Sequence, residues 1–337
     1  MKSIKSKEYG RSFLSFILLV LIIFACIFIF YNYFFSKNIS DNTLDLSSFE
    51  SDYPDYKIYH YSQLDDNGKT IYYTILNNIE TLKEGNQSIS IEINVANGSD
   101  AFQNAWDAIS LDKPEIFYID TTNLILESRS FSNLLGQTSY SYVLKPNANS
   151  STYLYKTWST KFDVDNAINQ VESLANQIVS SATGSRYTKV KYIHDYIVSN
   201  TSYSNSDDNV SNIYGTLINK KALCEGYSLA FKYLLDKLEI PNVVVYGKGL
   251  KDDGTTEEHS WNYVQMENGN WYAVDCTWDD PIVIGGGTLP TKYKYSFFLK
   301  GSSTFFKSHQ EENYVSSDSV TKTSTYFTYP TLSTTDY

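Results

Sequence analysis

The longest apolar stretch of this 337-residue chain lies near its N-terminus, from Phe13 to Phe35, and basic residues precede it: Lys2, Lys5, Lys7 and Arg11. About twenty apolar residues suffice to cross the hydrocarbon layer as a helix, and basic flanks stay in the cytoplasm. We therefore expect a cytoplasmic N-terminus over residues 1–11 and a single transmembrane anchor over 12–35. The rest of the chain would then face the outside of the cell.

Two other interpretations of this segment are open. A cleaved signal peptide has a shorter apolar core and small residues at its cleavage site, whereas aromatic residues follow Phe30 here. A lipoprotein would be modified at Cys26, but Ile23-Phe24-Ala25 matches the usual lipobox poorly and apolar residues continue past the cysteine. The anchor is the interpretation that we favour, with Cys26 as a lipid-facing thiol.

Beyond a polar linker over residues 36–51, helical and strand periods follow one another. Apolar residues recur at helical spacing over 67–82 and alternate as in a strand over 88–95. The pattern predicts a further helix over 99–109 and strands over 116–119, 124–129 and 139–144. These elements predict a smaller α+β region over residues 52–155.

A second region, over residues 156–315, begins with helices predicted over 164–180 and 186–199. Another helix begins at Cys224 and ends before Pro241, and its inner face carries Phe231, Leu234, Leu235 and Leu238. A strand over 243–246, a polar loop over 248–258 and a hairpin follow. The Ser-, Thr- and Tyr-rich tail, 316–337, is expected to pack loosely.

Composition and charge exclude some function classes. A hydrophobic content of 42% with 16% aromatic residues excludes global disorder. Without Glu8 and the four basic residues before the anchor, 23 basic and 37 acidic residues remain, a net charge of −14. Such a surface disfavours nucleic acid and anionic membrane surfaces as partners.

Cysteine usage favours reactivity over cross-linking. Outside the anchor only Cys224 and Cys276 occur, and a disulfide-dependent secreted domain normally carries more cysteines. We interpret Cys224 as a reactive thiol. A Cys224–Cys276 disulfide would block that thiol, and the sequence leaves this alternative open.

Three residues have the chemistry of a thiol acyl-transfer site: Cys224 at a helix start, then His259 and Asp275 on successive strands. A helix N-terminus and a nearby imidazolium stabilise a thiolate. A carboxylate orients the imidazole by accepting its other N–H, which leaves one ring nitrogen for the sulfur. We predict a Cys224–His259–Asp275 catalytic triad.

Three segments resemble the motifs of the transglutaminase-like superfamily: Ala222-Leu223-Cys224-Glu225-Gly226-Tyr227, His259-Ser260-Trp261-Asn262 and Val274-Asp275-Cys276-Thr277-Trp278-Asp279-Asp280-Pro281. The resemblance covers roughly residues 185–300. It implies a papain-like cysteine fold, in which a helix bearing the cysteine packs on an antiparallel sheet bearing the histidine and aspartate. It also implies activity on amide bonds, as transglutaminase, peptidase or deglycosylating amidase, with Cys224 as nucleophile, His259 as base and acid, and Asp275 as orienter.

The hairpin between His259 and Asp275 allows a geometric prediction. A two-residue turn at Asn268-Gly269 would place the two side chains on opposite faces of the sheet. A three-residue loop over 268–270 instead pairs Asp275 with Tyr263 and places it on the His259 face. It also pairs Val264 with Val274 and Met266 with Tyr272. We predict this register.

Other residues are assigned with less chemistry to support them. Trp261 and Trp271 share the predicted catalytic face and are candidates for the substrate cleft, while Trp278 is expected to be structural. The Cys224 N–H is a natural oxyanion donor, and Tyr203 or Tyr214 is a candidate for the second. The sequence suggests no chemistry for His60 and His309, and His194 is expected to be a satisfied core residue.

We predict no metal and no cofactor. A zinc site of Cys224, His259, Asp275 and Cys276 lacks close Cys-x-x-Cys spacing, and calcium at Asp279-Asp280 lacks the spaced oxygen ligands it needs.

The sequence therefore predicts a membrane-anchored enzyme that acts on protein or peptide substrates, including cell-wall peptides, by acyl transfer or hydrolysis. A non-catalytic extracellular module that binds proteins or the cell wall is the alternative on the same fold.

Overall fold

The structure is a computed structural model, and it describes residues 22–30, 46–133, 136–251, 253–280, 294–312, 314–315 and 325–337. The chain divides into two compact units, residues 1–45 with 131–139 and residues 46–130 with 140–337.

The predicted N-terminal anchor falls mostly outside the described residues. Within 12–35 only residues 22–30 are described, and they are helical. No helix in the described ranges is both long and apolar enough to cross a membrane. The anchor over 12–35 and the cytoplasmic segment 1–11 therefore stay predictions.

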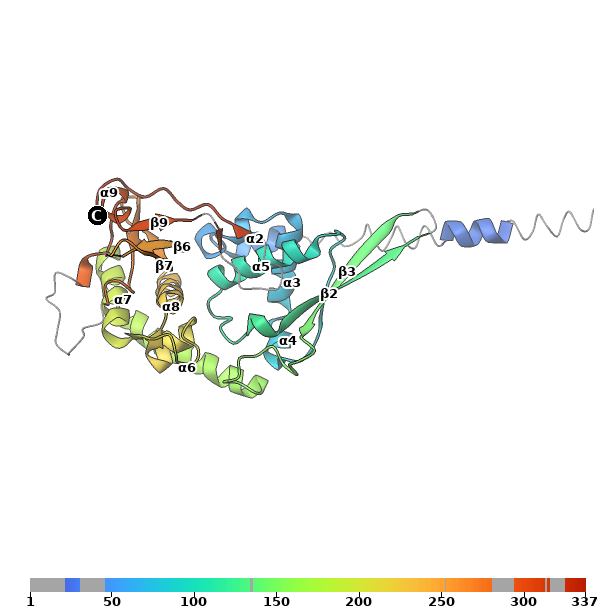
Figure 1. The fold of residues 1–337 in the computed structure, drawn as a ribbon, viewed down its shortest axis with the longest axis horizontal. Coiled ribbons are helices and arrows are strands. Elements are labelled where there is room, and N and C mark those ends of the chain that lie inside the picture. Colours follow the sequence, from blue (N-terminus) through green and yellow to red (C-terminus); the bar gives the residue numbers. More distant parts are fainter. Residues whose placement is uncertain are drawn as a thin grey trace, which may run out of the picture. The chain divides into compact units, whose positions relative to one another are not determined.

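A four-stranded antiparallel sheet in the second unit carries the predicted site. Its strands lie in the order β8-β7-β6-β9, with bounds β6 (Asn242–Leu250), β7 (Thr256–Gln265), β8 (Trp271–Val274) and β9 (His309–Glu311). Helix α8 (Cys224–Lys237) packs against β6 and β7 (Figure 1). The predicted α+β arrangement, a helix that begins with the cysteine on an antiparallel sheet, is confirmed.

Both faces of this sheet are buried, which explains the unbroken valine run of β6. Val244 and Val264 belong to the large core cluster that includes the α8 side chains Phe231 and Leu234. The opposite face forms a second cluster, made of Val243, Val245, Trp261, Tyr263 and Ala273 with Phe305 and Leu332. β-Branched and aromatic residues suit such a pleated, covered surface.

The predicted hairpin register is wrong by two residues. Asn262 pairs with Val274, and Val264 pairs with Tyr272 instead of Val274. The loop consists of Glu267, Asn268 and Gly269, because the Met266 N–H donates to the Asn270 carbonyl. A shift of two residues preserves the facing of every side chain, so Asp275 keeps the face of Trp261.

Helices on the N-terminal side of α8 follow their predicted ranges closely: α6 (Lys161–Ser181) and α7 (Arg186–Asn200). Thr160 and Asp163 form a capping box at the start of α6, and Ser185 caps α7. Between α7 and α8 lie three short elements: β4 (Ser202–Tyr203), a π-helical turn (Gly215–Asn219) and β5 (Lys221–Ala222).

The region before α6 differs in detail from its prediction. The helix predicted over 67–82 is interrupted at Asn78, and residues 116–119 form only an isolated bridge, Ile119 to Leu154, instead of a strand. Part of the predicted linker belongs to the fold, because Phe49 in residues 47–52 is buried. The bounds are α2 (Ser47–Asp52), α3 (Asp66–Asn77), α4 (Ile79–Glu84), β1 (Ile89–Ile91), α5 (Gly98–Asp112), β2 (Leu124–Ser132) and β3 (Thr138–Pro146), with sheet order β1-β3-β2.

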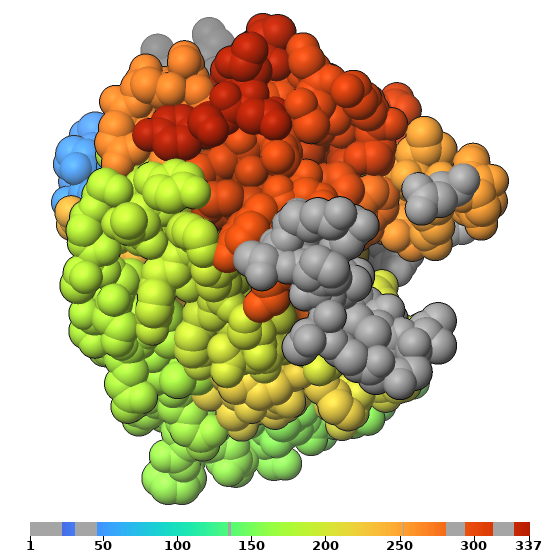
Figure 2. Space-filling view, turned by 90° about the vertical axis from the view of Figure 1, so that its left-hand side faces the viewer, coloured from blue at the N-terminus to red at the C-terminus, as the bar shows by residue number. Residues whose placement is uncertain are grey.

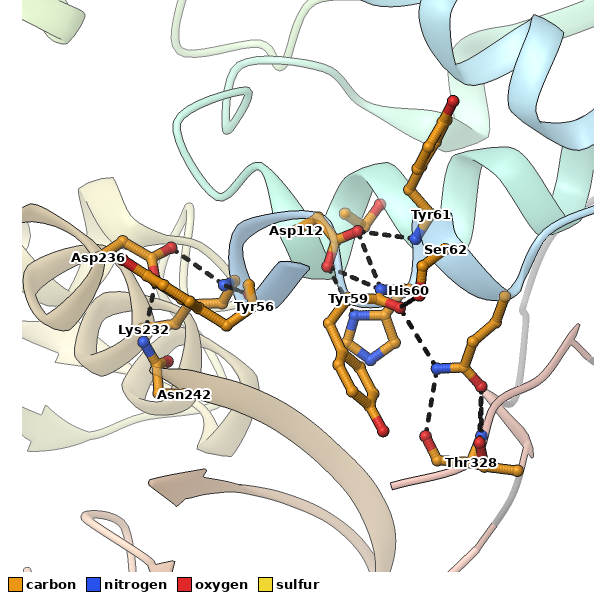
Figure 3. Close-up of polar contacts among 12 residues, drawn as sticks. Tyr56, Tyr59, His60, Tyr61, Ser62, Asp112, Lys232, Asp236, Asn242 and Thr328 are labelled. Atoms are coloured by element: carbon orange, nitrogen blue, oxygen red, sulfur yellow. Dashed lines mark hydrogen bonds and ion pairs between the residues drawn. The ribbon is translucent and has the colours of Figure 1, made fainter. Parts of the chain in front are cut away.

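One buried cluster extends from Phe49 to Phe327, without a break at the predicted domain boundary near residue 155. Figure 3 shows polar links that accompany it. The Asp112 carboxylate, at the end of α5, accepts from the His60 ring at 2.8 Å and from the Tyr61 N–H at 2.9 Å. Lys232 of α8 pairs with Asp236 at 3.0 Å and lies 3.5 Å from the Tyr56 carbonyl.

The C-terminal residues are not loosely packed, which corrects the prediction for this part of the tail. Phe327 is 1% exposed, and the Ser333 N–H donates to the Trp271 carbonyl at 2.8 Å. Tyr337 stacks on Tyr187 of α7, and Figure 2 shows the C-terminal residues against that helix. The remaining short elements are α9 (Ser302–Phe305), β10 (Tyr314–Val315) and β11 (Thr325–Tyr326).

Candidate active site

Cys224 is the first residue of α8 and is partly exposed. The preceding residue, Leu223, is extended, with φ −84° and ψ 173°. Its N–H donates to the Val210 carbonyl at 2.8 Å, and its carbonyl accepts from the Tyr227 N–H at 3.1 Å. The helix therefore begins at Cys224, and the positive end of its dipole lies at the thiol.

Gly226 allows a neighbouring loop to approach the start of α8. A Cβ at this position would lie 2.4 Å from the Val210 carbonyl oxygen and 2.9 Å from Thr216 Oγ1. The backbone oxygen cannot rotate away as a flexible side chain could. Glycine at this position therefore keeps the loop in contact with the helix turn that carries Cys224.

We expect Gly226→Ala to lower the free energy of unfolding by about 1–3 kcal/mol, the usual cost of overpacking. The measurement is urea unfolding followed by circular dichroism, together with the alkylation rate of Cys224, which should fall. Gly254→Ala is the control, because a Cβ there meets nothing within 4 Å and only its φ of +83° opposes the change. Equal effects of the two substitutions on Cys224 alkylation would contradict the assignment.

His259 and Asp275 come together as the strand pattern predicts. His259 Nε2 lies 2.7 Å from Asp275 Oδ2, and both side chains are buried. Because Asp275 occupies Nε2, Nδ1 is the ring nitrogen left for the sulfur. Cys224 lies close enough to the His259 ring to contribute, after Asp275, to raising its pKa.

The electrostatics of the pair favour a charged imidazole. Burial alone would lower the pKa of His259, but the Asp275 carboxylate and then Cys224 outweigh it and raise the pKa to about 10. Burial likewise opposes the charge of Asp275, yet His259 and His309 hold its pKa well below the usual range. His259 is therefore an imidazolium at neutral pH and loses its charge only as the pH rises through about 10.

Asp275 is held by four donors, of which the sequence indicated only His259. Oδ1 accepts from the N–H groups of Thr277 at 2.8 Å and Trp278 at 3.1 Å. Oδ2 accepts from His259 and also from His309 Nε2 at 3.1 Å. The expectation that His309 has no chemical neighbours is wrong, because the edge strand β9 brings it to Asp275.

The aromatic wall of the site differs from the prediction. Trp278, which we expected to be merely structural, is partly exposed and stacks on His259 at 5.1 Å between ring centroids. Trp261 is 1% exposed, 6.0 Å from the His259 ring, and therefore supports the site from within the core. Trp271 packs in the second core cluster beside Leu332 and does not contact His259 in any ring pair of the described residues.

The two tyrosines considered as oxyanion donors lie in different places. Tyr203 pairs with Ala222, two residues before Cys224, and burial followed by the charge of Cys224 raises the pKa of its hydroxyl. It stays a candidate. Tyr214 stacks on Phe117, and its hydroxyl donates to Gln170 at 3.3 Å, so it is not positioned beside Cys224.

Residues 172–276, which include all three predicted triad residues, match the family model of the transglutaminase-like superfamily. The chain contains a transglutaminase-like domain. The resemblance inferred from the motifs is thereby confirmed. None of the curated proteins matches the chain.

Solved structures similar to this chain include one described as a TGase, at 17% identity and a TM-score of 0.32, with 63% of this chain and 55% of that chain covered. This chain thus spans little more than half of its length. A proposed cysteine protease from Cytophaga hutchinsonii has 18% identity and a TM-score of 0.27, with 46% and 64% covered. The periplasmic domain of TgpA from Pseudomonas aeruginosa, bound to ethylmercury, has 13% identity and a TM-score of 0.26, with 48% and 69% covered.

Two further titratable side chains near the proposed triad, those of His194 and Cys276, are buried in the core. His194 is fully buried and lies 3.0 Å from Asp279 and 3.2 Å from Asp195, so the prediction of a satisfied core histidine is confirmed. Cys276 is a free thiol, 3% exposed, and burial raises its pKa. Cys224 is also free, so the structure contains no disulfide between them.

Among the described residues, one group has the spacing of metal ligands. The ligand atoms of His259, Asp275 and His309 lie within 4.8 Å of one another. Both histidines, however, are at hydrogen-bonding distance from the same carboxylate oxygen. Their donors are therefore satisfied by the carboxylate, and the geometry is that of a hydrogen-bonded array.

Proposed function

We propose that this protein acts on amide bonds of proteins or peptides by thiol-dependent acyl transfer or hydrolysis, with Cys224, His259 and Asp275 as its triad. The observation that carries the proposal is the 2.7 Å contact between the His259 ring and buried Asp275, with Cys224 interacting with the same ring. The partly exposed thiol at the start of α8, next to this buried pair, favours the enzyme over the alternative of a non-catalytic binding module.

In the proposed reaction the Cys224 thiolate attacks the carboxamide or peptide carbonyl, and the bond to nitrogen breaks. The His259 imidazolium protonates the leaving amine, which leaves a thioester on Cys224 and a neutral ring. Water or a second amine then attacks the thioester while neutral His259 accepts its proton, and the carbon–sulfur bond breaks, which releases the product and restores the Cys224 thiolate and the His259 imidazolium. An amine acceptor would give crosslinking, and water would give peptidase or deamidase activity.

The test is the reaction of Cys224 with iodoacetamide. An ion-paired thiolate should alkylate far faster than an ordinary thiol at about pH 6, where a free cysteine is almost entirely protonated. The rate is measured by mass spectrometry of the Cys224 peptide, with buried Cys276 as the internal control. A Cys224 rate no higher than that of free cysteine would overturn the proposal and favour a binding module.

Two extensions of this experiment address substrate and location. Ammonia release from glutamine peptides with and without a primary amine distinguishes hydrolysis from crosslinking.

We also propose that the apolar segment over 12–35 tethers the domain outside the membrane. A thiol reagent that does not cross membranes should then label Cys224 in intact cells, and protection there would contradict the outward location.

A further inference from the structure

His309 lies in a closed aromatic environment next to Asp275. Its side chain is fully buried, and its ring stacks on Phe305 at 3.9 Å with an angle of 16° between the planes. Trp278 and Phe297 complete the enclosure, at 4.4 and 5.2 Å between centroids. Both ring nitrogens have partners, Nε2 with Asp275 at 3.1 Å and Nδ1 with the Ser308 hydroxyl at 3.0 Å.

The strand geometry explains why the ring reaches this place. His309 is the first residue of β9 and pairs with Gly249 of β6. A Cβ on Gly249 would lie 2.5 Å from the Trp278 indole, so the glycine leaves room for the indole, which stacks on His259 and packs at an angle of 52° against His309. The pairing of β9 with β6 therefore brings His309 to Asp275. This pairing is separate from the β7–β8 hairpin, which links His259 to Asp275.

The hydrogen bonds determine which ring nitrogen of neutral His309 carries the hydrogen. An ionised carboxylate only accepts, so Nε2 carries the hydrogen, and Nδ1 accepts from Ser308 when the ring is neutral. Burial and the charge of His259 lower the pKa of His309 despite Asp275. The titratable groups that face the array are Cys224 toward His259, and Cys276 and Asp279 toward Asp275.

We propose that His309 is a positioning residue for the proposed triad, because its neutral ring donates a fixed hydrogen bond to Asp275 Oδ2. Asp275 follows the last residue of β8, and its Oδ1 is held by two backbone N–H groups. The His309 donor fixes the second oxygen at the position that His259 requires. A second imidazolium on the same carboxylate would repel the charge of His259, whereas a neutral donor does not. This inference rests on the proposed function.

The test compares His309→Leu, which removes the donor, with His309→Gln, whose amide nitrogen can occupy the Nε2 position. We expect His309→Leu to reduce kcat about tenfold with little change in KM, since a hydrogen bond to a charged group contributes at least this much. The pH at which kcat falls on the alkaline side should rise in His309→Leu. Asp275 then accepts from one donor fewer, so its charge stabilises the His259 imidazolium more strongly. His309→Gln should restore both the rate and the profile.

Ser308→Ala keeps the ring in place and provides a milder variant, with an expected loss of a few fold. Nitrogen chemical shifts of His309 should show the neutral Nε2–H tautomer both in the wild-type protein and in Ser308→Ala, because the Asp275 carboxylate at Nε2 only accepts. A wild-type pH profile and rate in His309→Leu would overturn the inference, as would equal losses in the Leu and Gln variants. If either result occurs while Cys224 of the wild-type protein still alkylates rapidly, the inference about His309 fails but the proposed function does not. Slow alkylation of wild-type Cys224 would instead overturn the proposed function itself.

Discussion

Replacement of Cys224 by alanine is expected to abolish product formation while the protein stays folded. Without the sulfur no thioester forms, and the remaining groups only bind and polarise the substrate. The rate should fall by about 10⁴-fold or more, as in other enzymes that lose their nucleophile. Because Cys224 is partly exposed at the first turn of α8, the substitution removes few core contacts. The measurement is ammonia release from a glutamine peptide, with thermal unfolding as the check of fold.

Cys276→Ala is the matched control for this substitution. Cys276 is buried in the large core cluster, and its raised pKa keeps it a neutral thiol. Its removal should leave turnover within a few fold of wild type and lower stability modestly through a small cavity. Activity retained in Cys224→Ala, or lost equally in Cys276→Ala, would refute the assignment of the nucleophile.

The local pattern was sufficient to place Cys224 at a helix start and His259 and Asp275 on one face of the sheet. Apolar residues at helical spacing predicted the helix that begins at Cys224, and the structure has it at Cys224–Lys237. His259 and Asp275 were predicted to share a face, and they lie 2.7 Å apart. Side chains on a strand alternate between the two faces of the sheet. A register error of an even number of residues therefore leaves each side chain on its predicted face.

The register itself was wrong because the loop was placed one residue too late. A three-residue hairpin loop favours a left-handed residue, usually glycine, at its last position. Gly269 has a φ of +80° and ends the observed loop, whereas the prediction placed it in the middle. Asn268 also accepts from the Asn270 N–H at 3.0 Å, which favours the observed turn. Turn chemistry at Gly269 would have predicted the observed register.

His309 could not have been found by the same reasoning. It lies 34 residues after Asp275 on a three-residue edge strand, and no spacing rule connects the two. Its role depends on the pairing of β9 with β6, a contact between segments about sixty residues apart. The packed C-terminal residues were missed for a similar reason, since Ser-, Thr- and Tyr-rich composition does not reveal partners such as Trp271.

Asp275→Asn is expected to have the second large effect, on both rate and pH dependence. The amide carries no charge and cannot accept from His259 and His309 as the carboxylate does. Turnover should fall by about 10³–10⁴-fold, the scale seen when an orienting aspartate is replaced in a catalytic triad. Asp280→Asn is the control from the same turn, because its amide oxygen can still accept from the Tyr227 hydroxyl, which lies 2.6 Å from Asp280.

The direction of the pH change follows from the cause of the His259 shift. Asp275 is the main group that raises the pKa of His259 to about 10, against the lowering effect of burial. Without that carboxylate, burial dominates, and the ring should lose its proton below the ordinary histidine value of about 6.5. The fast alkylation of Cys224 that depends on the imidazolium should therefore disappear at neutral pH in Asp275→Asn, while Asp280→Asn keeps the wild-type profile. If the alkaline side of the pH profile of Cys224 alkylation is unchanged in Asp275→Asn, another group must stabilise the charge on His259. Asp275 would then not be the third member of the proposed triad.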